Sequence, residues 1–194
     1  MLYKSSLVKD PKEIEEVYSF IKKHPMDYPG HDEWCQKAYR ETVLGYKKIV
    51  AILNTDKKGN IEVVGSILFQ PDKQDPSVLE MKNIRVAEKY RKIRIFTRLL
   101  SDVEKYAKEQ GFKRLYVDAG TDYKDIISAL GKRGFSVVAK ENLYSNERLE
   151  VLFAKDVRKG IITSVDTAVM KAIQELKLEM LKTLRWVIAL VNRQ

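Results

Sequence analysis

The sequence predicts a mixed α/β domain followed by one long C-terminal helix. Two patterns lead to this prediction. Over residues 1–157, apolar residues at helical spacing alternate with short runs rich in Val, Ile and Tyr, whereas residues 158–194 hold one continuous helical stripe. Of the 194 residues, 44% are hydrophobic and 32% charged, which is typical of soluble globular proteins. We therefore expect one domain over 1–157 and a helical extension over 158–194.

Two helices are predicted to open the domain. "DPKEIEEVYSFIKKH" places apolar residues three or four apart between residues 10 and 23, with Asp10 as the N-cap and Pro11 at the first helical position. The turn "PMDYPGHDEW" separates this segment from a second helix, predicted over about residues 31–44. Both helices precede the first predicted strand.

Three strands and a helix follow. "YKKIVAIL" and "IEVVGSILFQ" flank "NTDKKGN", whose Asn, Asp and Gly residues favour a hairpin turn. "VLEMKNIRV" is the third strand, and an amphipathic helix over about 94–110 ends at Gly111. "KRLYVDAG" then reads as a strand, "YKDIISALGKRG" as a short helix, and "FSVVAKENLYSNERLEVLFAKDV" as two strands around a polar turn. The predicted order is β-β-β-α-β-α-β-β behind the two leading helices.

The C-terminal helix is predicted over about residues 163–192. Its apolar stripe steps by three or four residues through Val165, Val169, Ile173, Leu176, Met180, Leu184, Val187 and Val191. At 1.5 Å per residue it spans about 45 Å, more than one small domain covers. Because a soluble monomer rarely exposes so large an apolar face, the helix either folds back along its own domain or packs on a second copy. Its length favours the second arrangement, and we expect a homodimer in which these helices pair or swap onto the partner.

The charge balance limits the partners without choosing among them. A formal net charge of +9 and a sequence pI of about 9.4 favour polyanions, whether nucleic acid, acidic lipid or a phosphorylated cofactor. One Cys excludes an intramolecular disulfide, and one Cys with two His argues against a dedicated zinc site. We therefore expect no bound metal. Because no uncharged run reaches membrane-spanning length and no secretion signal is visible, we also expect a cytoplasmic protein.

The stretch "KYRKIRIFTRLL", residues 89–100, carries five basic residues at the start of a predicted helix. A helix N-terminus already bears partial positive charge, so this arrangement suggests a nearby anion. A strand ending in "IRV", a short turn and an Arg that opens a helix resemble motif A of the GNAT superfamily of acyl-CoA-dependent N-acetyltransferases, Gln/Arg-x-x-Gly-x-Gly/Ala. Arg91 matches the first position, whereas Arg94 and Phe96 occupy the two Gly positions. The order of elements and the "GKRGF" segment are also similar to the family.

This resemblance implies a mostly antiparallel central sheet flanked by helices, and acetyl-CoA as co-substrate. It implies that the backbone of Ile84 and Val86 holds the pantetheine arm. The pyrophosphate would be held by Arg91, Lys92, Ile93, Arg94, Ile95 and Phe96. Side chains at the two former Gly positions either obstruct the approach of the backbone to phosphate or tilt outward and leave its N–H groups accessible.

The implied reaction moves an acetyl group to a primary amine and needs a base and an acid. Glu80 stands eleven residues before the Arg of motif A, a spacing similar to one branch of the family, and is the favoured base. The alternative for Glu80 is an ion pair with a neighbouring Lys. The position of the family's acidic Tyr holds Leu130, so Tyr123 or Tyr144 would replace it, and we favour Tyr144. Asp118 fits the lining of a cleft and a turn equally well.

Two other functions remain open. A catalytically inactive relative could bind nucleic acid or another polyanion through the basic helix, which the lost glycines, the missing Tyr and the net charge favour. Few aromatic residues interleave the basic run, which argues against binding of single strands. Attachment of the C-terminal helix to a membrane surface is disfavoured by Glu175 and Glu179 on its polar side. The motif does not identify the acceptor amine.

Overall fold

The computed structural model describes residues 5–24, 30–145 and 148–157. The chain divides into two units, Met1–Arg158 and Lys159–Gln194, and all described residues belong to the first. The predicted helix over about residues 163–192, within the extension 158–194, lies outside them, and so does the predicted homodimer contact. Within the described ranges, every helix is too short or too polar to cross a bilayer.

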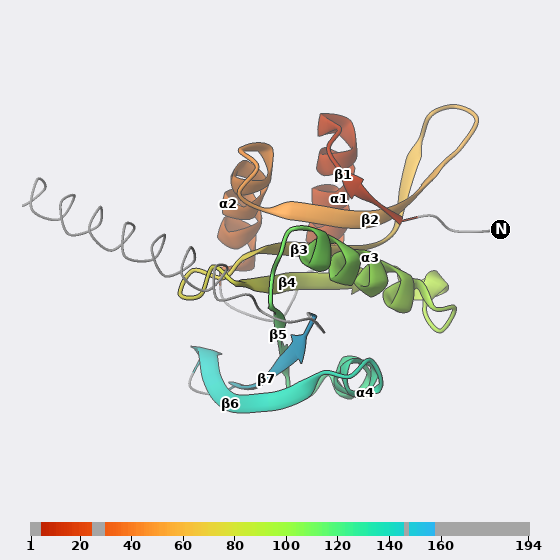
Figure 1. The fold of residues 1–194 in the computed structure, drawn as a ribbon. Helices are drawn as coiled ribbons and strands as arrows, with labels where there is room; N and C mark the ends of the chain where they lie inside the picture. The colour runs from red at the N-terminus through yellow and green to blue at the C-terminus, as the bar shows by residue number, and fades with distance from the viewer. Residues whose placement is uncertain (1–4, 25–29, 146–147, 158–194) are drawn as a thin grey trace, which may run out of the picture. The chain divides into compact units, whose positions relative to one another are not determined.

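A seven-stranded sheet forms the centre of the domain (Figure 1). Its spatial order is β1-β2-β3-β4-β5-β7-β6, and every neighbouring pair is antiparallel except β4 and β5, which run parallel. The strands are β1 (Ser5–Val8), β2 (Lys48–Thr55), β3 (Ile61–Pro71), β4 (Val78–Val86), β5 (Arg114–Gly120), β6 (Ser136–Ser145) and β7 (Arg148–Asp156). The predicted mixed, mostly antiparallel sheet is thus confirmed.

Helices cover both faces of the sheet (Figure 1). They are α1 (Pro11–Lys23), α2 (His31–Val43), α3 (Ile95–Glu109) and α4 (Lys124–Lys132), with a 3₁₀ turn, η1, at Glu88–Tyr90. Because successive strand residues point to opposite faces, Ile49 and Ala51 of β2 pack with α1 and α2. Val50 and Ile52 join α3 and α4 in the larger core on the other face.

The local signals at helix ends are confirmed. The side chain of Asp10 accepts hydrogen bonds from the backbone N–H groups of Lys12 and Glu13, which caps α1. Gly111 has φ of 80° just after α3, the conformation for which glycine is suited. The sequence analysis missed η1 and also β1, a four-residue edge strand whose one sheet partner is β2. A strand that short carries no measurable alternation of apolar residues.

Helix α3 crosses β3 at close range, and Gly65 makes this possible. A β-carbon at Gly65 would lie 2.8 Å from the backbone oxygen of Arg85 and 3.1 Å from side-chain atoms of Ile95 and Leu99. No side chain larger than hydrogen therefore fits between the helix and the strand. The close contact places the N-terminus of α3 beside the C-terminal end of β4.

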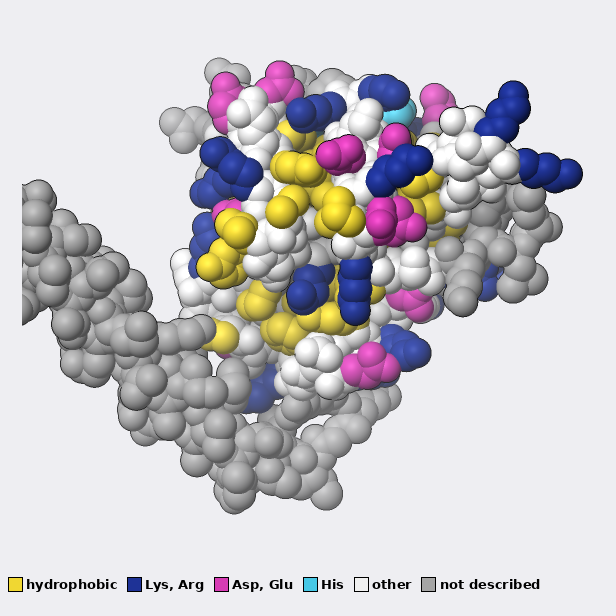
Figure 2. Space-filling view, turned by 90° about the horizontal axis from the view of Figure 1, so that it is seen from above, with side chains coloured by type: hydrophobic (Ala, Val, Ile, Leu, Met, Phe, Trp, Pro, Cys, Tyr) yellow, Lys and Arg dark blue, Asp and Glu magenta, His cyan; other side chains and the backbone are white. Residues whose placement is uncertain are grey.

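Charged side chains of both signs cover the described surface. On the face shown in Figure 2, Lys and Arg side chains stand among Asp and Glu side chains around a central group of hydrophobic ones. The net charge of +9 over the whole sequence is therefore not gathered into one continuous basic patch on this face.

Candidate active site

Strands β4 and β5 separate partway along their length. They pair over only four residues each, Val78–Met81 with Arg114–Val117. Beyond this point β4 keeps its pairing with β3, and β5 keeps its pairing with β7. The edge of β4 from Lys82 to Val86 that faces β5 consequently has no strand partner within the described sheet. Two parallel strands that part in this way leave a cleft bordered by backbone N–H and C=O groups.

A β-bulge marks the point of separation. Leu68 of β3 faces Asn83, and the next residue, Phe69, faces Met81, so Lys82 is an extra residue in β4. Bulges bend a strand and redirect one side chain. Here the bend directs the second half of β4 away from β5, and Lys82 lies at the mouth of the opening.

The cleft has a volume of about 1310 Å³ and extends from the loop before α3 to α2. Ile84 and Val86 line it from β4, and Val117, Asp118 and Ala119 line it from β5. Helix α4 and strand β6 close one side through Tyr123 and Tyr144. The elements that surround the cleft are distant in sequence, and the fold alone brings them together.

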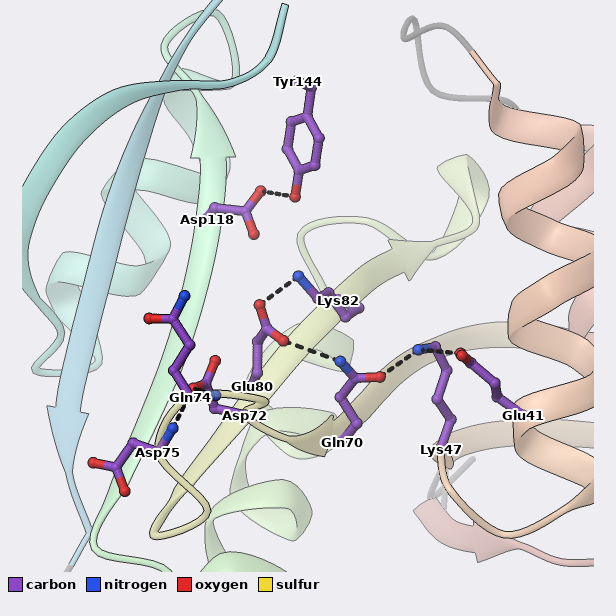
Figure 3. Close-up of polar contacts among 10 residues, drawn as sticks. All are labelled: Glu41, Lys47, Gln70, Asp72, Gln74, Asp75, Glu80, Lys82, Asp118 and Tyr144. Atoms are coloured by element: carbon purple, nitrogen blue, oxygen red, sulfur yellow. Dashed lines mark hydrogen bonds and ion pairs between the residues drawn. The ribbon is translucent and has the colours of Figure 1, made fainter. Parts of the chain in front are cut away.

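A chain of charged and polar side chains runs beside the cleft, and all of its members except Glu80 line it (Figure 3). Glu80 forms an ion pair with Lys82 and accepts a hydrogen bond of 3.1 Å from the Gln70 side-chain amide. The other end of Gln70 accepts from Lys47, whose ammonium group lies 2.7 Å from Glu41 of α2. Lys47 and Gln70 are 7% and 8% exposed, so the chain is largely shielded from water and holds Glu80 in place.

Asp118 and Tyr144 form a second polar pair opposite this chain (Figure 3). The Tyr144 hydroxyl donates a hydrogen bond of 2.9 Å to Asp118. Burial raises the pKa of the Asp118 carboxyl above its ordinary value, although the charge of Lys82 and the bond from Tyr144 act in the opposite direction. Burial and the neighbouring Asp118 also raise the pKa of Tyr144, which keeps its proton at neutral pH. The cleft thus holds a carboxylate suited to accept a proton beside a hydroxyl that carries one.

The loop before α3 has a backbone that its residues rarely adopt. Lys92 and Arg94 both have positive φ, 64° and 65°, although neither is glycine. Arg94 is the N-cap of α3 and makes no capping bond through its side chain. The first N–H groups of α3 therefore stay available for an anion. The backbone at these two positions thus has a conformation that usually favours glycine, although Lys and Arg occupy them.

Arg148 closes the side of the cleft below Tyr123. Its guanidinium lies 5.3 Å from the centre of the Tyr123 ring and 2.8 Å from the carboxylate of Glu150, which has no exposed surface. A β-carbon at Gly120 would lie 2.7 Å from this guanidinium, so the missing side chain makes room for it. Burial raises the pKa of Glu150, while Arg148 acts to lower it. This wall is therefore built around an ion pair whose carboxylate is fully buried.

Comparison with known families gives the site a context. Residues 13–135 match the Acetyltransferase (GNAT) family, and this segment is more than half of the chain. The chain belongs to the GNAT family of acetyltransferases. A comparison with curated proteins finds no match.

Solved structures agree with this GNAT fold. The chain is similar to a protein of Desulfovibrio desulfuricans assigned as a GNAT acetyltransferase (15% identity, 80% of this chain and 100% of that chain, TM-score 0.67). It is also similar to NAA60 of Arabidopsis thaliana, solved with a bisubstrate analogue (16% identity, 79% of this chain and 98% of that chain, TM-score 0.63). A third similar structure is a Bacillus anthracis protein assigned as a streptothricin acetyltransferase, solved with acetyl coenzyme A (16% identity, 57% of this chain and 62% of that chain, TM-score 0.50). At these identities the likeness establishes the fold.

Most residues predicted to contact the co-substrate line the GNAT cleft. These are Ile84, Val86, Arg91, Lys92, Arg94, Ile95 and Phe96. Ile93 is 51% exposed and does not line the cleft. The role of the seven lining residues in binding stays a prediction. The structure brings these seven together at the place where β4 and β5 separate and α3 begins.

The two predicted catalytic residues lie at one end of the cleft in different settings. Tyr144 lines the cleft, whereas Glu80 is not among the residues that line it and forms the ion pair with a neighbouring Lys that was its alternative interpretation. Leu130 has no exposed surface and is part of the hydrophobic core, so the GNAT position for an acidic Tyr offers no proton here. Asp118 lines the cleft, which settles the open choice for that residue.

The sequence did not predict three of the polar residues beside the cleft, which are Lys82, Gln70 and Lys47. The first is placed by a bulge, and the other two are joined by a contact across 23 residues of sequence, so no local pattern marks them. Over the part of the chain that the structure describes, no group of three or more His, Cys, Asp or Glu side chains is placed to hold a metal ion.

The left-handed backbone at Arg94 leads to a stability prediction. Arg94→Gly should have a free energy of unfolding about 1 kcal/mol larger than Arg94→Ala, because only Ala keeps a β-carbon that crowds a left-handed backbone. Urea denaturation of the two variants measures the difference. The same pair of changes at Arg98, inside α3, is the matched control and should give the opposite order, because Gly is the poorer helix residue there. An Ala variant as stable as the Gly variant at Arg94 would contradict the assigned backbone.

Proposed function

We propose that the protein transfers the acetyl group of acetyl-CoA to a primary amine, whose nitrogen attacks the thioester directly. The observation that carries the proposal is the joining of three features in one cleft. They are the parted strands β4 and β5, the N-terminus of α3 and the pair of Asp118 and Tyr144. Membership of the GNAT family supports the same reaction class.

The loop before α3 fits a pyrophosphate. The left-handed backbone at Arg94 turns the chain into α3 so that the first-turn N–H groups lie at the cleft. Arg91, Lys92 and Arg94 are exposed and line the same end, and guanidinium groups bind phosphate oxygens through two parallel hydrogen bonds. Backbone donors and basic side chains would therefore share the phosphates, as the sequence predicts.

The unpaired edge of β4 fits the pantetheine arm. From Lys82 to Val86 the backbone facing β5 lacks a strand neighbour, and Ile84 and Val86 present apolar side chains to the cleft. An extended amide chain can hydrogen-bond to such an edge in the manner of an added strand. The arm would then run along β4 from the phosphates toward Lys82.

We assign proton transfer from the acceptor amine to Asp118. Asp118 lines the cleft, and its raised pKa makes it a better base than an ordinary Asp. Glu80, the base favoured by the sequence, must first exchange its contacts with Lys82 and Gln70. It remains the alternative. As C–N forms and C–S breaks, Tyr144 gives its proton to the CoA thiolate and recovers one through Asp118.

The nucleic-acid alternative stays open, although one observation favours CoA. Arg91, Lys92 and Arg94 border a cleft with an apolar wall instead of standing on an open basic face. Such a concave site suits a small phosphorylated ligand better than a duplex backbone.

An acetyl-transfer assay tests the proposal. The full chain is incubated with acetyl-CoA and a panel of amines that includes small amines, lysine peptides and peptides with a free N-terminus, and release of the CoA thiol is followed. We expect release that depends on at least one amine and saturates with its concentration. Thiol release that no amine accelerates, from a protein that binds acetyl-CoA, would contradict the transfer reaction.

A further inference from the structure

Lys82 lies where the reactive end of the co-substrate would reach. As the bulged residue of β4 it lines the cleft together with Ile84 and Val86, which alternate along the same strand. Its side chain is 23% exposed. From Val86 back to Lys82 the strand covers about 13 Å at 3.3 Å per residue. If the arm runs along β4 from the phosphates, as the proposed function requires, its thioester end lies near Lys82.

The Lys82 amine already has a proton acceptor in contact with it. Glu80 forms an ion pair with Lys82, and the Lys82 side chain lines the cleft (Figure 3). Glu80 cannot readily turn away, because Gln70 holds its second oxygen and is itself bonded to the buried Lys47. An amine and a carboxylate fixed in contact are the two groups that acyl transfer to nitrogen needs.

We propose that Lys82 is a self-acetylation site, modified by acetyl-CoA bound in the protein's own cleft. Glu80 takes one proton from the Lys82 ammonium, and the neutral nitrogen attacks the thioester carbonyl carbon. The C–N bond forms, the C–S bond breaks, and the leaving CoA thiolate takes the second proton lost by the nitrogen. The products are an Nε-acetyl group on Lys82 and free CoA. This proposal rests on the proposed function, because both need acetyl-CoA in this cleft.

Acetylation would change the electrostatics of the catalytic end. Lys82 and Glu80 both act on Asp118, Lys82 favouring its charged form and Glu80 opposing it. An acetyl group removes the positive charge of Lys82, so of these two charges only that of Glu80 continues to act on Asp118. The acceptor end of the cleft would then lose one positive charge and gain a neutral amide.

The experiment uses the full chain with acetyl-CoA and no acceptor amine, followed by intact mass spectrometry and peptide mapping. We expect one acetyl group per chain, located on Lys82, with one equivalent of CoA thiol released. Lys82→Arg should abolish this label, and Glu80→Gln should slow it at least tenfold while acetyl-CoA affinity stays unchanged in both. Lys37→Arg is the control. Lys37 lines the same cleft, no ion pair of its side chain is found among the described residues, and the change should leave the label on Lys82 unaltered.

Two outcomes would overturn the proposal, and they differ from failure of the proposed function. Label spread over exposed lysines at similar rates would show ordinary chemical acetylation. A protein that binds acetyl-CoA yet stays unlabelled at Lys82 would refute self-acetylation alone. Absence of acetyl-CoA binding in a calorimetric titration would instead remove the proposed function together with this inference.

Discussion

Asp118→Asn lowers the turnover number by about 10²–10⁴-fold, the usual loss when a general base is removed. Asn keeps the size of the side chain and an oxygen that can accept the bond from Tyr144. The acidic limb of the pH profile of kcat/KM should lie above the ordinary Asp range in the parent protein, because burial raises the pKa of Asp118. That limb should disappear in the variant. Steady-state kinetics over pH on both proteins measure these effects.

Asp122→Asn and Glu80→Gln complete this comparison. Asp122 also lines the cleft, so its Asn variant makes the same charge change and should keep most of the activity. If Glu80→Gln instead removes the acidic limb and Asp118→Asn leaves it in place, Glu80 is the base, as the sequence favoured. A loss of similar size in all three variants would point to general disruption of the cleft.

Thermal unfolding shows whether Asp118→Asn loses activity because the base is missing or because the protein no longer folds. The folded state holds the Asp118 proton to higher pH than the unfolded chain, so stability falls as the pH rises from about 4 through the raised pKa. Asn does not ionise, so the variant does not lose stability in this way as the pH rises. The variant should therefore unfold at a higher temperature than the parent at pH 7, and the gain should vanish below about pH 4.

Replacing Arg91 and Arg94 together by Ala weakens CoA binding at least tenfold, or about 1.4 kcal/mol. Both side chains stand at the cleft end where α3 begins, so the variant removes two donors to phosphate and keeps the helix N-terminus. Calorimetric titration with CoA measures the change.

Lys105→Ala with Lys108→Ala is the matched control for that variant. It removes the same charge from α3 about three turns farther along, roughly 15–20 Å away. CoA affinity should stay within about twofold there. Equal weakening in both double variants would mean that net charge attracts CoA, and unchanged affinity in the Arg variant would mean that the backbone alone binds it.

The order of elements was predictable because each has a local signal. Asp10 marks the start of α1 because its side chain caps the helix. The "NTDKKGN" turn forms as expected, and the Asp56 side chain accepts hydrogen bonds from the backbone N–H groups of Lys58 and Asn60. Short β1 lacks such a signal. Its assignment depends on its pairing with β2, a contact across more than forty residues of sequence.

The site was predictable only in part. Arg91 could be selected from the family pattern, whereas Tyr144 was chosen as a substitute because the pattern places its Tyr at Leu130. Both residues line the cleft. The left-handed backbone of Arg94 contradicts local preference. The helix that begins there packs Ile95 and Leu99 closely on Gly65 of β3, a contact between segments distant in sequence that no local pattern encodes. The bulge at Lys82 and the contacts that hold Glu80 arise from strand register, which single-residue patterns do not encode.

Isothermal titration of the full chain with acetyl-CoA tests the central claim most directly, because every assigned role depends on that ligand occupying the cleft between β4 and β5. We predict one binding site per chain with a dissociation constant in the micromolar range, weakened by the Arg91 and Arg94 changes and unaffected by Lys105→Ala with Lys108→Ala. A folded protein that shows no binding of acetyl-CoA or CoA at millimolar concentrations would contradict the claim, and the GNAT fold here would then serve another purpose.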